Sequence, residues 1–222
     1  MTDTAKTGDP IDELQEMYVR CKMKQLKLGS PTDSLRVKAN ERYCAPQMRS
    51  IPLEPRVIAV KAQCGMGKTE AINNWMLATR YRYYVFACHR TALAGAAMGL
   101  LPELLRKQPW VWARNMTDII YLADSLYVVI QIESLCRLCL QNCELGEIGL
   151  ILDECNSINR QLESQCGDYA KAQSCFEILC ENAHVLALDG FLDQDRINVL
   201  RRYTKSEVYT IENTFMRLMD QV

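Results

Sequence analysis

The sequence lacks an apolar run long enough to cross a membrane. Its longest such run, Ala92–Leu101, contains two glycines, whereas a membrane-spanning helix needs roughly 18 to 20 apolar residues. The first residues, Met1–Ile11, are polar and carry charges of both signs, so they do not form a secretory signal segment. We therefore expect an intracellular protein, nuclear or cytoplasmic, without a membrane partner.

A large excess of either charge is also missing. The 222 residues include 26 Lys/Arg and 27 Asp/Glu, a formal net charge of −1, which argues against a strongly basic, non-specific DNA binder. The charge is unevenly placed: residues 1–107 hold 17 Lys/Arg and 10 Asp/Glu, whereas residues 108–222 hold 9 and 17. The basic first half would suit a polyanion, but surface charge fluctuates along any sequence, and both interpretations stay open.

Internal repeats and low-complexity tracts are absent as well. Hydrophobic residues make up 49% of the chain and charged residues 24%, which is typical of a globular protein and excludes collagen-like, coiled-coil and disordered structure for most of it. In a reducing compartment the 11 cysteines would be free thiols, metal ligands or buried small hydrophobes rather than disulfides. The length suits one α/β domain with a small appendage.

The pattern of the sequence changes at Arg56. Before it, residues 11–28 have helical apolar spacing, and residues 31–55 are loop-like with a short polar helix as an option over 34–43. After it, short apolar runs alternate with helical patterns, and residues 108–125 are ambiguous. We expect strands at 57–60, 83–87, 127–132, 148–152, 184–188 and 207–211, and helices at 68–80, 92–100, 133–143, 161–182 and 194–203.

This alternation predicts an α/β fold, in which a mostly parallel sheet is covered by helices on both faces. We expect residues 51–222 to form the domain. Residues 1–50 would form a small N-terminal extension of helix and loop.

The strongest motif is a phosphate-binding loop, AQCGMGKT at residues 62–69, which directly follows a predicted strand and opens a predicted helix. Gly65 and Gly67 let the backbone approach phosphates, whose charge backbone N–H groups and the helix N-terminus stabilise. Lys68 would reach the β- and γ-phosphates of ATP, and the Thr69 hydroxyl would bind Mg²⁺. The alternative is a glycine-rich turn with an incidental Gly-Lys-Thr. The predicted nucleotide-binding residues are Ala62, Gln63, Cys64, Gly65, Met66, Gly67, Lys68, Thr69 and Glu70.

A pair of carboxylates, Asp153 and Glu154, ends the apolar run at 148–152. P-loop NTPases need an acid at such a strand end to hold Mg²⁺, and many place a second acid beside it to orient the attacking water. We assign Asp153 to the metal together with Thr69, and Glu154 to the water, so Lys68, Asp153 and Glu154 are the predicted catalytic residues. The alternative is a pair of helix N-terminal acids.

Together, the loop and the acid pair resemble those of superfamily 2 helicases. Further segments resemble herpesvirus-type replication origin-binding proteins: VFACHRTALA at 85–94, YVVIQIESL at 127–135, DECNSI at 153–158 and VLALDG at 185–190. The resemblance covers about residues 41–211, with departures at Met66, Cys155 and Gly190. It implies the first RecA-like domain of a helicase-like ATPase that acts on DNA, and it would also fit a viral replication site.

The resemblance implies roles for further residues. In the related helicases the tip after the second strand touches the nucleic-acid backbone, and here that tip is His89, Arg90 and Thr91. Gln131 and Ser134 would line the same groove or couple it to the ATP site. The alternatives are a local cap or ion pair for Arg90, and helix capping or packing for Gln131 and Ser134.

The related helicases carry a second RecA-like domain with arginine fingers, and we expect it to be missing here because only ten residues follow Glu212. Another chain or a longer parent protein would supply it, and hydrolysis by this domain alone would be weak. Asp189 would link the ATP site to that second domain, or be a turn residue. The competing functions are a non-catalytic, nucleotide-dependent binding module and a small P-loop kinase, which would need an arginine-rich lid.

Cysteine and tryptophan residues leave further alternatives. Cys136, Cys139 and Cys143 have the spacing of part of an iron–sulfur or zinc motif. The same spacing places them on one face of the predicted helix, where they would be core residues. Cys64 would be a reactive thiol near a helix N-terminus. Trp110 and Trp112 would stack on bases or simply pack.

Overall fold

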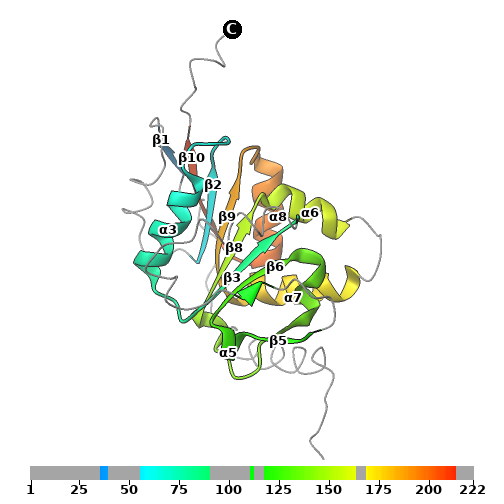
Figure 1. The fold of residues 1–222 in the computed structure, drawn as a ribbon. Coiled ribbons are helices and arrows are strands. Elements are labelled where there is room, and N and C mark those ends of the chain that lie inside the picture. The colour runs from blue at the N-terminus through cyan, green and yellow to red at the C-terminus, as the bar shows by residue number, and fades with distance from the viewer. Residues whose placement is uncertain (1–35, 40–55, 91–110, 113–117, 164–168, 214–222) are drawn as a thin grey trace, which may run out of the picture.

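The computed structural model describes residues 36–39, 56–90, 111–112, 118–163 and 169–213 (Figure 1). They contain one eight-stranded sheet in the order β1-β10-β2-β9-β8-β3-β6-β4, in which every neighbouring pair is parallel. The strands are β1 (Arg36–Ala39), β2 (Val57–Lys61), β3 (Tyr83–Cys88), β4 (Val111–Trp112), β6 (Tyr127–Gln131), β8 (Ile148–Asp153), β9 (His184–Asp189) and β10 (Val208–Asn213).

Helices lie on both faces of this sheet (Figure 1). Helix α3 covers one face, and α6, α7 and α8 cover the other. The helices are α3 (Lys68–Thr79), α5 (Leu122–Ser125), α6 (Cys155–Glu163), α7 (Tyr169–Asn182) and α8 (Gln194–Thr204), with 3-10 helices η1 (Ile132–Arg137) and η2 (Leu145–Glu147). Two short strands, β5 (Ile120–Tyr121) and β7 (Leu138–Cys139), form a separate parallel pair. The predicted fold class is confirmed.

The central strands are apolar along their whole length because both of their faces are covered. In β2, Val57 and Ala59 point into the cluster that α6, α7 and α8 complete, whereas Ile58 and Val60 point into the cluster under α3. The same alternation divides the side chains of β3 and β8 between the two clusters. A single buried sheet therefore joins two apolar layers.

The start of β2 is anchored by a half-buried cation, Arg56. The guanidinium of Arg56 donates to the carbonyl oxygens of Cys180 and Ala183, each at 3.2 Å, at the end of α7, and to that of Thr204 at the end of α8. Helix C-termini carry free carbonyl groups and partial negative charge, which a cation satisfies. Burial lowers the pKa of Arg56 from its usual value, while the nearby Cys180 and Glu181 oppose that shift.

Three sequence-based predictions of local structure were wrong. The helix expected at 133–143 is a 3-10 helix followed by the short strand β7 and a turn, because the segment pairs with β5 instead of continuing. The short helix considered over 34–43 is replaced at Arg36–Ala39 by β1, which pairs with β10. The third concerns only the start of the helix expected at 161–182: α6 already begins at Cys155, whereas the described residues 161–163 and 169–182 are helical as expected.

The cysteines at 136, 139 and 143 do not share a helix face, since no helix spans them. Cys139 and Cys143 are buried, as expected for core residues, whereas Cys136 is half-buried. Burial raises the pKa of the Cys143 thiol to about 11. Among the described residues, no group of three or more His, Cys, Asp or Glu side chains is arranged to hold a metal ion.

Several predictions lie outside the described residues. They are the helices at 11–28 and 92–100, Thr91 and Trp110, and the side chain of Trp112. Within the described ranges, none of the helices combines the length and apolar character that a membrane crossing requires.

Gly149 in β8 packs closely against side chains from the neighbouring strand β3 and from helix α3. A Cβ atom at this position would lie 2.6 Å from two ring carbons of Tyr84 and 3.1 Å from Trp75 on α3. We expect Gly149→Ala to destabilise the protein by about 1–3 kcal/mol, the usual cost of overpacking, as measured by urea unfolding. Gly146→Ala is the matched control, because a Cβ there meets nothing within 4 Å, and an equal loss in both variants would contradict the explanation.

Candidate nucleotide-binding site

The predicted site residues come together at one edge of the sheet. Strands β2, β9, β8, β3 and β6 are neighbours in that order and all parallel, so their carboxyl ends share an edge. In open α/β sheets, ligands bind outside this edge. The residues at these ends are the 62–70 loop after β2, Asp189 on β9, Asp153 and Glu154 on β8, His89 and Arg90 after β3, and Gln131 on β6.

The loop after β2 has the backbone conformation that a phosphate-binding loop requires. Gly65 and Gly67 have φ angles of 74° and 81°, in the left-handed region that L-residues with a side chain rarely occupy. Gly67 also caps the N-terminus of α3, and the Ala71 N–H donates to its carbonyl oxygen at 2.9 Å. The free N–H groups of the first helical turn are therefore available for an anion.

The position of Met66 explains how the loop tolerates a departure from the pattern of the helicases that the sequence resembles. Its side chain is only 1% exposed and belongs to the apolar cluster under α3. Its N–H donates to the Gln63 carbonyl at 3.3 Å, which closes a tight turn. Gln63 and Cys64 are exposed on this turn, while Lys68 and Thr69 are half-buried. The methionine thus anchors the loop in the core while the glycines on either side stay open.

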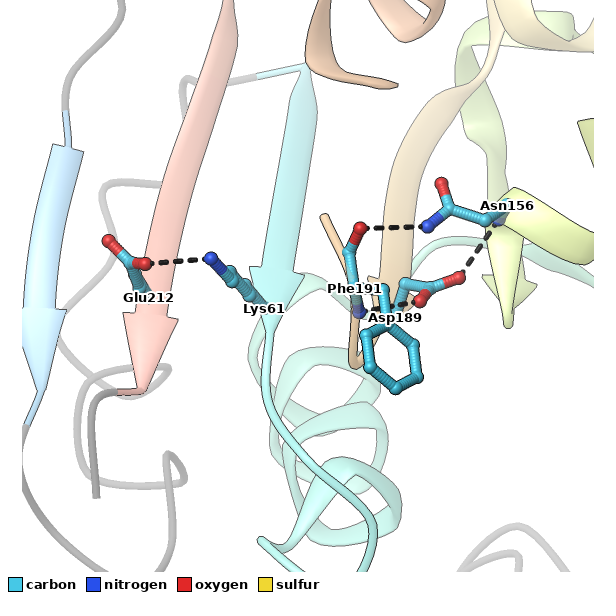
Figure 2. Close-up of polar contacts among 5 residues, drawn as sticks. All are labelled: Lys61, Asn156, Asp189, Phe191 and Glu212. Atoms are coloured by element: carbon cyan, nitrogen blue, oxygen red, sulfur yellow. Dashed lines mark hydrogen bonds and ion pairs between the residues drawn. The ribbon is translucent and has the colours of Figure 1, made fainter. Parts of the chain in front are cut away.

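Asp189, at the end of β9, fastens three segments of the edge together (Figure 2). Its carboxylate is 4% exposed and accepts hydrogen bonds from the N–H groups of Asn156, at 2.9 Å, and Phe191, at 2.8 Å. Its carbonyl oxygen accepts from the Ala62 N–H at 3.0 Å. The Asn156 side chain completes the connection by donating to the Phe191 carbonyl at 3.0 Å. The phosphate loop, the start of α6 and the turn after β9 are therefore held in one arrangement.

Lys61 and Glu212 form a second polar link at this edge (Figure 2). They are register partners on the adjacent strands β2 and β10, and their side chains meet at 3.0 Å. The Glu212 side chain is 13% exposed and that of Lys61 35%. The pair ties the last residue of β2 to the neighbouring strand just before the phosphate loop begins.

Asp153 lies where a metal-holding carboxylate is needed. Burial raises the pKa of its carboxyl group; the positive charge of Lys68 lowers it, and the negative charges of Glu154 and Asp189 raise it further. An ionised carboxylate in such surroundings is destabilised until a cation approaches.

These residues fit a bound Mg·ATP. The open turn and helix N-terminus suit the phosphates, Lys68 supplies positive charge, and Thr69 and Asp153 are oxygen donors of the kind that Mg²⁺ prefers. The metal would neutralise phosphate charge when bound. The role of each residue toward nucleotide and metal stays a prediction.

The residues predicted to contact nucleic acid differ in exposure. Arg90 is exposed beside the end of β3, whereas the His89 side chain is only 10% exposed and lies against Glu154. Gln131 is half-buried, and Ser134 is 6% exposed within η1. Arg90 is therefore the described residue of this set that is best placed for a phosphate contact, and Ser134 is placed for packing.

Sequence motifs do not reveal the parts of the site that depend on hydrogen bonds between distant segments. Asn156 binds Asp189 and Phe191, and Lys61 binds Glu212, and none of these three contacts lies within a local motif. The available signal was the parallel order of strands, which places residues at the ends of neighbouring strands side by side. That signal needs the strand order, which only the structure provides.

The fold is RecA-like and is shared with solved helicases. The DEAD-box helicase Mss116 bound to single-stranded RNA and UDP-BeF matches with a TM-score of 0.52 at 15% identity, over 83% of this chain and 48% of that one. A Dbp5 variant from Saccharomyces cerevisiae in a complex containing ADP gives 0.54 at 15%, over 92% and 52%. A hypothetical ATP-dependent RNA helicase from Sulfolobus tokodaii gives 0.54 at 14%, over 90% and 57%.

This chain spans about half the length of these solved proteins. No family model matches it, and no curated protein matches it by sequence. At these identities the likeness concerns the fold of one helicase RecA-like domain. The finer resemblance to replication origin-binding proteins stays a prediction.

We expect Asp189→Asn to lower the free energy of unfolding by about 1–3 kcal/mol, because the amide keeps one acceptor oxygen and turns an NH₂ group toward a buried N–H. Urea unfolding measures this loss. Asp195→Asn makes the same change at an exposed carboxylate in the first turn of α8 and should alter stability by less than about 0.5 kcal/mol. Similar values for the two variants would show that the buried carboxylate does not hold the edge together.

Asp153→Asn should separate stability from binding. Because burial raises the pKa of Asp153, its ionised form opposes folding, and the neutral amide should leave the melting temperature of the ligand-free protein equal to the wild type or about 2–4 °C higher. The same variant should lose the ability of Mg²⁺ to raise that temperature in the presence of ATP. Thermal melts with Mg²⁺ and with EDTA test both statements, and a variant that melts well below the wild type without ligand would contradict the first.

Proposed function

We propose that this chain is the ATP-binding RecA-like motor domain of a superfamily 2 helicase-like enzyme, which hydrolyses ATP with Mg²⁺ in response to nucleic acid. The observation that carries the proposal is the loop at 62–69, whose two glycines adopt left-handed backbone at the N-terminus of α3. Across this edge, the positive charge of Lys68 lowers the pKa of Asp153 against the effect of burial. A cation, a carboxylate and a helix N-terminus at the same edge of the sheet support the binding of phosphates and their metal.

In this proposal, the loop and the first turn of α3 bind the phosphates, and Lys68 contacts the terminal ones. Thr69 and Asp153 hold the metal. Glu154, which is 43% exposed, orients the water that attacks the γ-phosphate. These groups then act from the ends of two strands, β2 and β8, at the carboxyl edge of a parallel sheet, where ligands usually bind.

The nucleic-acid partner is proposed to bind beside the end of β3, where Arg90 is exposed. The resemblance of the sequence to origin-binding proteins favours DNA. By contrast, the solved Mss116 structure holds single-stranded RNA. Both nucleic acids therefore belong in the assay, and origin recognition is not assigned to this domain.

Efficient turnover should need a second RecA-like domain, from another chain or a longer parent protein. Arginine fingers in related NTPases raise rates by about 10³ to 10⁵. The alternative function, a nucleotide-dependent binding module without turnover, would use the same phosphate loop but would not depend on Glu154.

We expect Glu154→Gln to bind ATP as tightly as the wild type and to reduce turnover by about 100-fold or more, because the amide cannot act as a base toward water. Fluorescent-nucleotide binding and single-turnover phosphate release, each with an excess of protein, measure the two quantities. Lys68→Ala is the control that should lose binding itself. Glu154→Gln turnover equal to that of the wild type would remove Glu154 from the proposed mechanism.

The same assay separates motor from module when single-stranded and double-stranded DNA and single-stranded RNA are added in turn. Stimulation of wild-type turnover by any of them supports the motor. Nucleotide binding that depends on Lys68, without turnover under any of these conditions, supports the binding module.

A further inference from the structure

His89 and Glu154 meet across the carboxyl ends of two neighbouring strands. Strands β3 and β8 pair in parallel, with Ala87 opposite Leu152, so the residues two positions further along, His89 and Glu154, lie side by side. Their side chains approach to 3.7 Å between Nε2 and Oε2. The contact therefore follows from strand register, and only a small rotation of the exposed carboxylate would shorten it to a hydrogen bond.

The two partners differ in their freedom to move. The His89 side chain is 10% exposed, whereas the Glu154 side chain is 43% exposed. Among the described residues, no hydrogen-bond partner meets the buried Nδ1 atom of His89. The imidazole is thus held by packing, and its Nε2 atom faces the more exposed carboxylate of Glu154.

Glu154 also has an uncommon backbone conformation. Its φ angle is 56°, in the left-handed region, which costs free energy for a residue with a side chain. Its carbonyl oxygen accepts from the N–H groups of Ser157, at 2.9 Å, and Ile158, at 3.2 Å, in the first turn of α6. The backbone of Glu154 is therefore fixed, and what stays adjustable is the direction of its carboxylate.

Nothing acidic or basic on β8 itself can direct that carboxylate, because the other side chains of the strand are apolar apart from Asp153. His89 is the group that faces it from the adjacent strand end. Burial lowers the pKa of His89 below its usual value, and Glu154 opposes this shift. A mostly neutral imidazole can donate from Nε2 to the carboxylate without neutralising it as an ion pair would.

We propose that His89 is a positioning residue for hydrolysis, which holds the Glu154 carboxylate in place and links it to the nucleic-acid contact at Arg90. Arg90 directly follows His89 and is exposed. A nucleic-acid strand bound at Arg90 would shift the end of β3. The imidazole of His89, which faces Glu154, would move with it. His89 acts through Glu154, and it need not touch nucleotide or nucleic acid.

This inference rests on the proposed function, because it assigns the orientation of the water-directing Glu154. The contact itself can nevertheless be tested without turnover. Loss of nucleotide binding in Lys68→Ala tests the proposed function, whereas the magnetic-resonance experiment below tests the pairing of His89 with Glu154.

The kinetic test compares His89→Ala with the wild type and with His89→Gln, whose amide can still donate a hydrogen bond. We expect His89→Ala to lower kcat by about 10- to 100-fold, the effect of a misplaced catalytic group, with KM and the Kd for nucleotide changed by less than twofold. Stimulation by nucleic acid should be lost, and His89→Gln should restore part of both. In a Glu154→Gln background the His89 substitution should have no further effect.

His184→Gln is the matched control. It changes the other of the chain's two histidines, whose Nδ1 atom is likewise buried without a described partner. His184 lies at the amino end of β9, away from the carboxyl ends of the strands where the candidate site lies. Its kcat should equal that of the wild type. Unchanged kcat in His89→Ala, or an equal loss with and without Glu154, would overturn the proposal.

Nuclear magnetic resonance provides the second readout, since only two imidazole rings contribute signals and His89→Ala identifies which signals belong to His89. Glu154→Ala should shift the His89 ring signals and leave those of His184 in place. Addition of a non-hydrolysable ATP analogue with the stimulating oligonucleotide should shift the His89 signals in the wild type. His89 signals that do not respond to Glu154→Ala would overturn the proposal even when turnover is too slow to measure.

Discussion

The arrangement of the candidate site depends on one buried carboxylate. Asp189 is 4% exposed. Its carboxylate accepts hydrogen bonds from N–H groups at the start of α6 and in the turn after β9, and its carbonyl oxygen accepts one from Ala62, the first residue of the 62–69 loop. A buried charge is costly unless it is satisfied in this way. Three segments far apart in the sequence therefore have to stay together, and their mutual position sets the distance between the phosphate loop and the carboxylates of β8.

Around Asp189, the side chains with proposed roles in nucleotide binding and hydrolysis lie in environments or conformations that cost free energy. Burial raises the pKa of Asp153 and lowers that of His89, and Glu154 occupies left-handed backbone. Such costs are common at functional sites, because favourable interactions with a bound ligand can offset them. At this edge, the hydrogen bonds of Asp189 hold the structure together, whereas Asp153, Glu154 and His89 are the residues with proposed functional roles.

Similarity to solved structures and the sequence motifs point to families of different breadth. Solved helicases share the RecA-like fold over most of this chain, at about 15% identity and over about half of their own length. The resemblance read from the motifs is finer, since it points to origin-binding proteins and DNA. Both agree on a RecA-like fold of the kind found in helicases. Met66 shows how a loop can keep its shape with a different residue at one position. Its backbone forms part of the turn, and its buried side chain packs in the core.

The sequence by itself determined the α/β alternation, the central strands, and the positions of the loop at 62–69 and of the acid pair, since these depend on local spacing and on apolar runs. It did not determine where short segments pair, so a helix was expected at β7, which pairs with β5, and was one option at β1, which pairs with β10. It also could not show the Asp189 hydrogen bonds or the contact of His89 with Glu154. Apart from the local bond to Phe191, those depend on strand order and register, which bring together residues 33 to 127 positions apart, such as Asn156 with Asp189 and Ala62 with Asp189. Only the tertiary structure decided them.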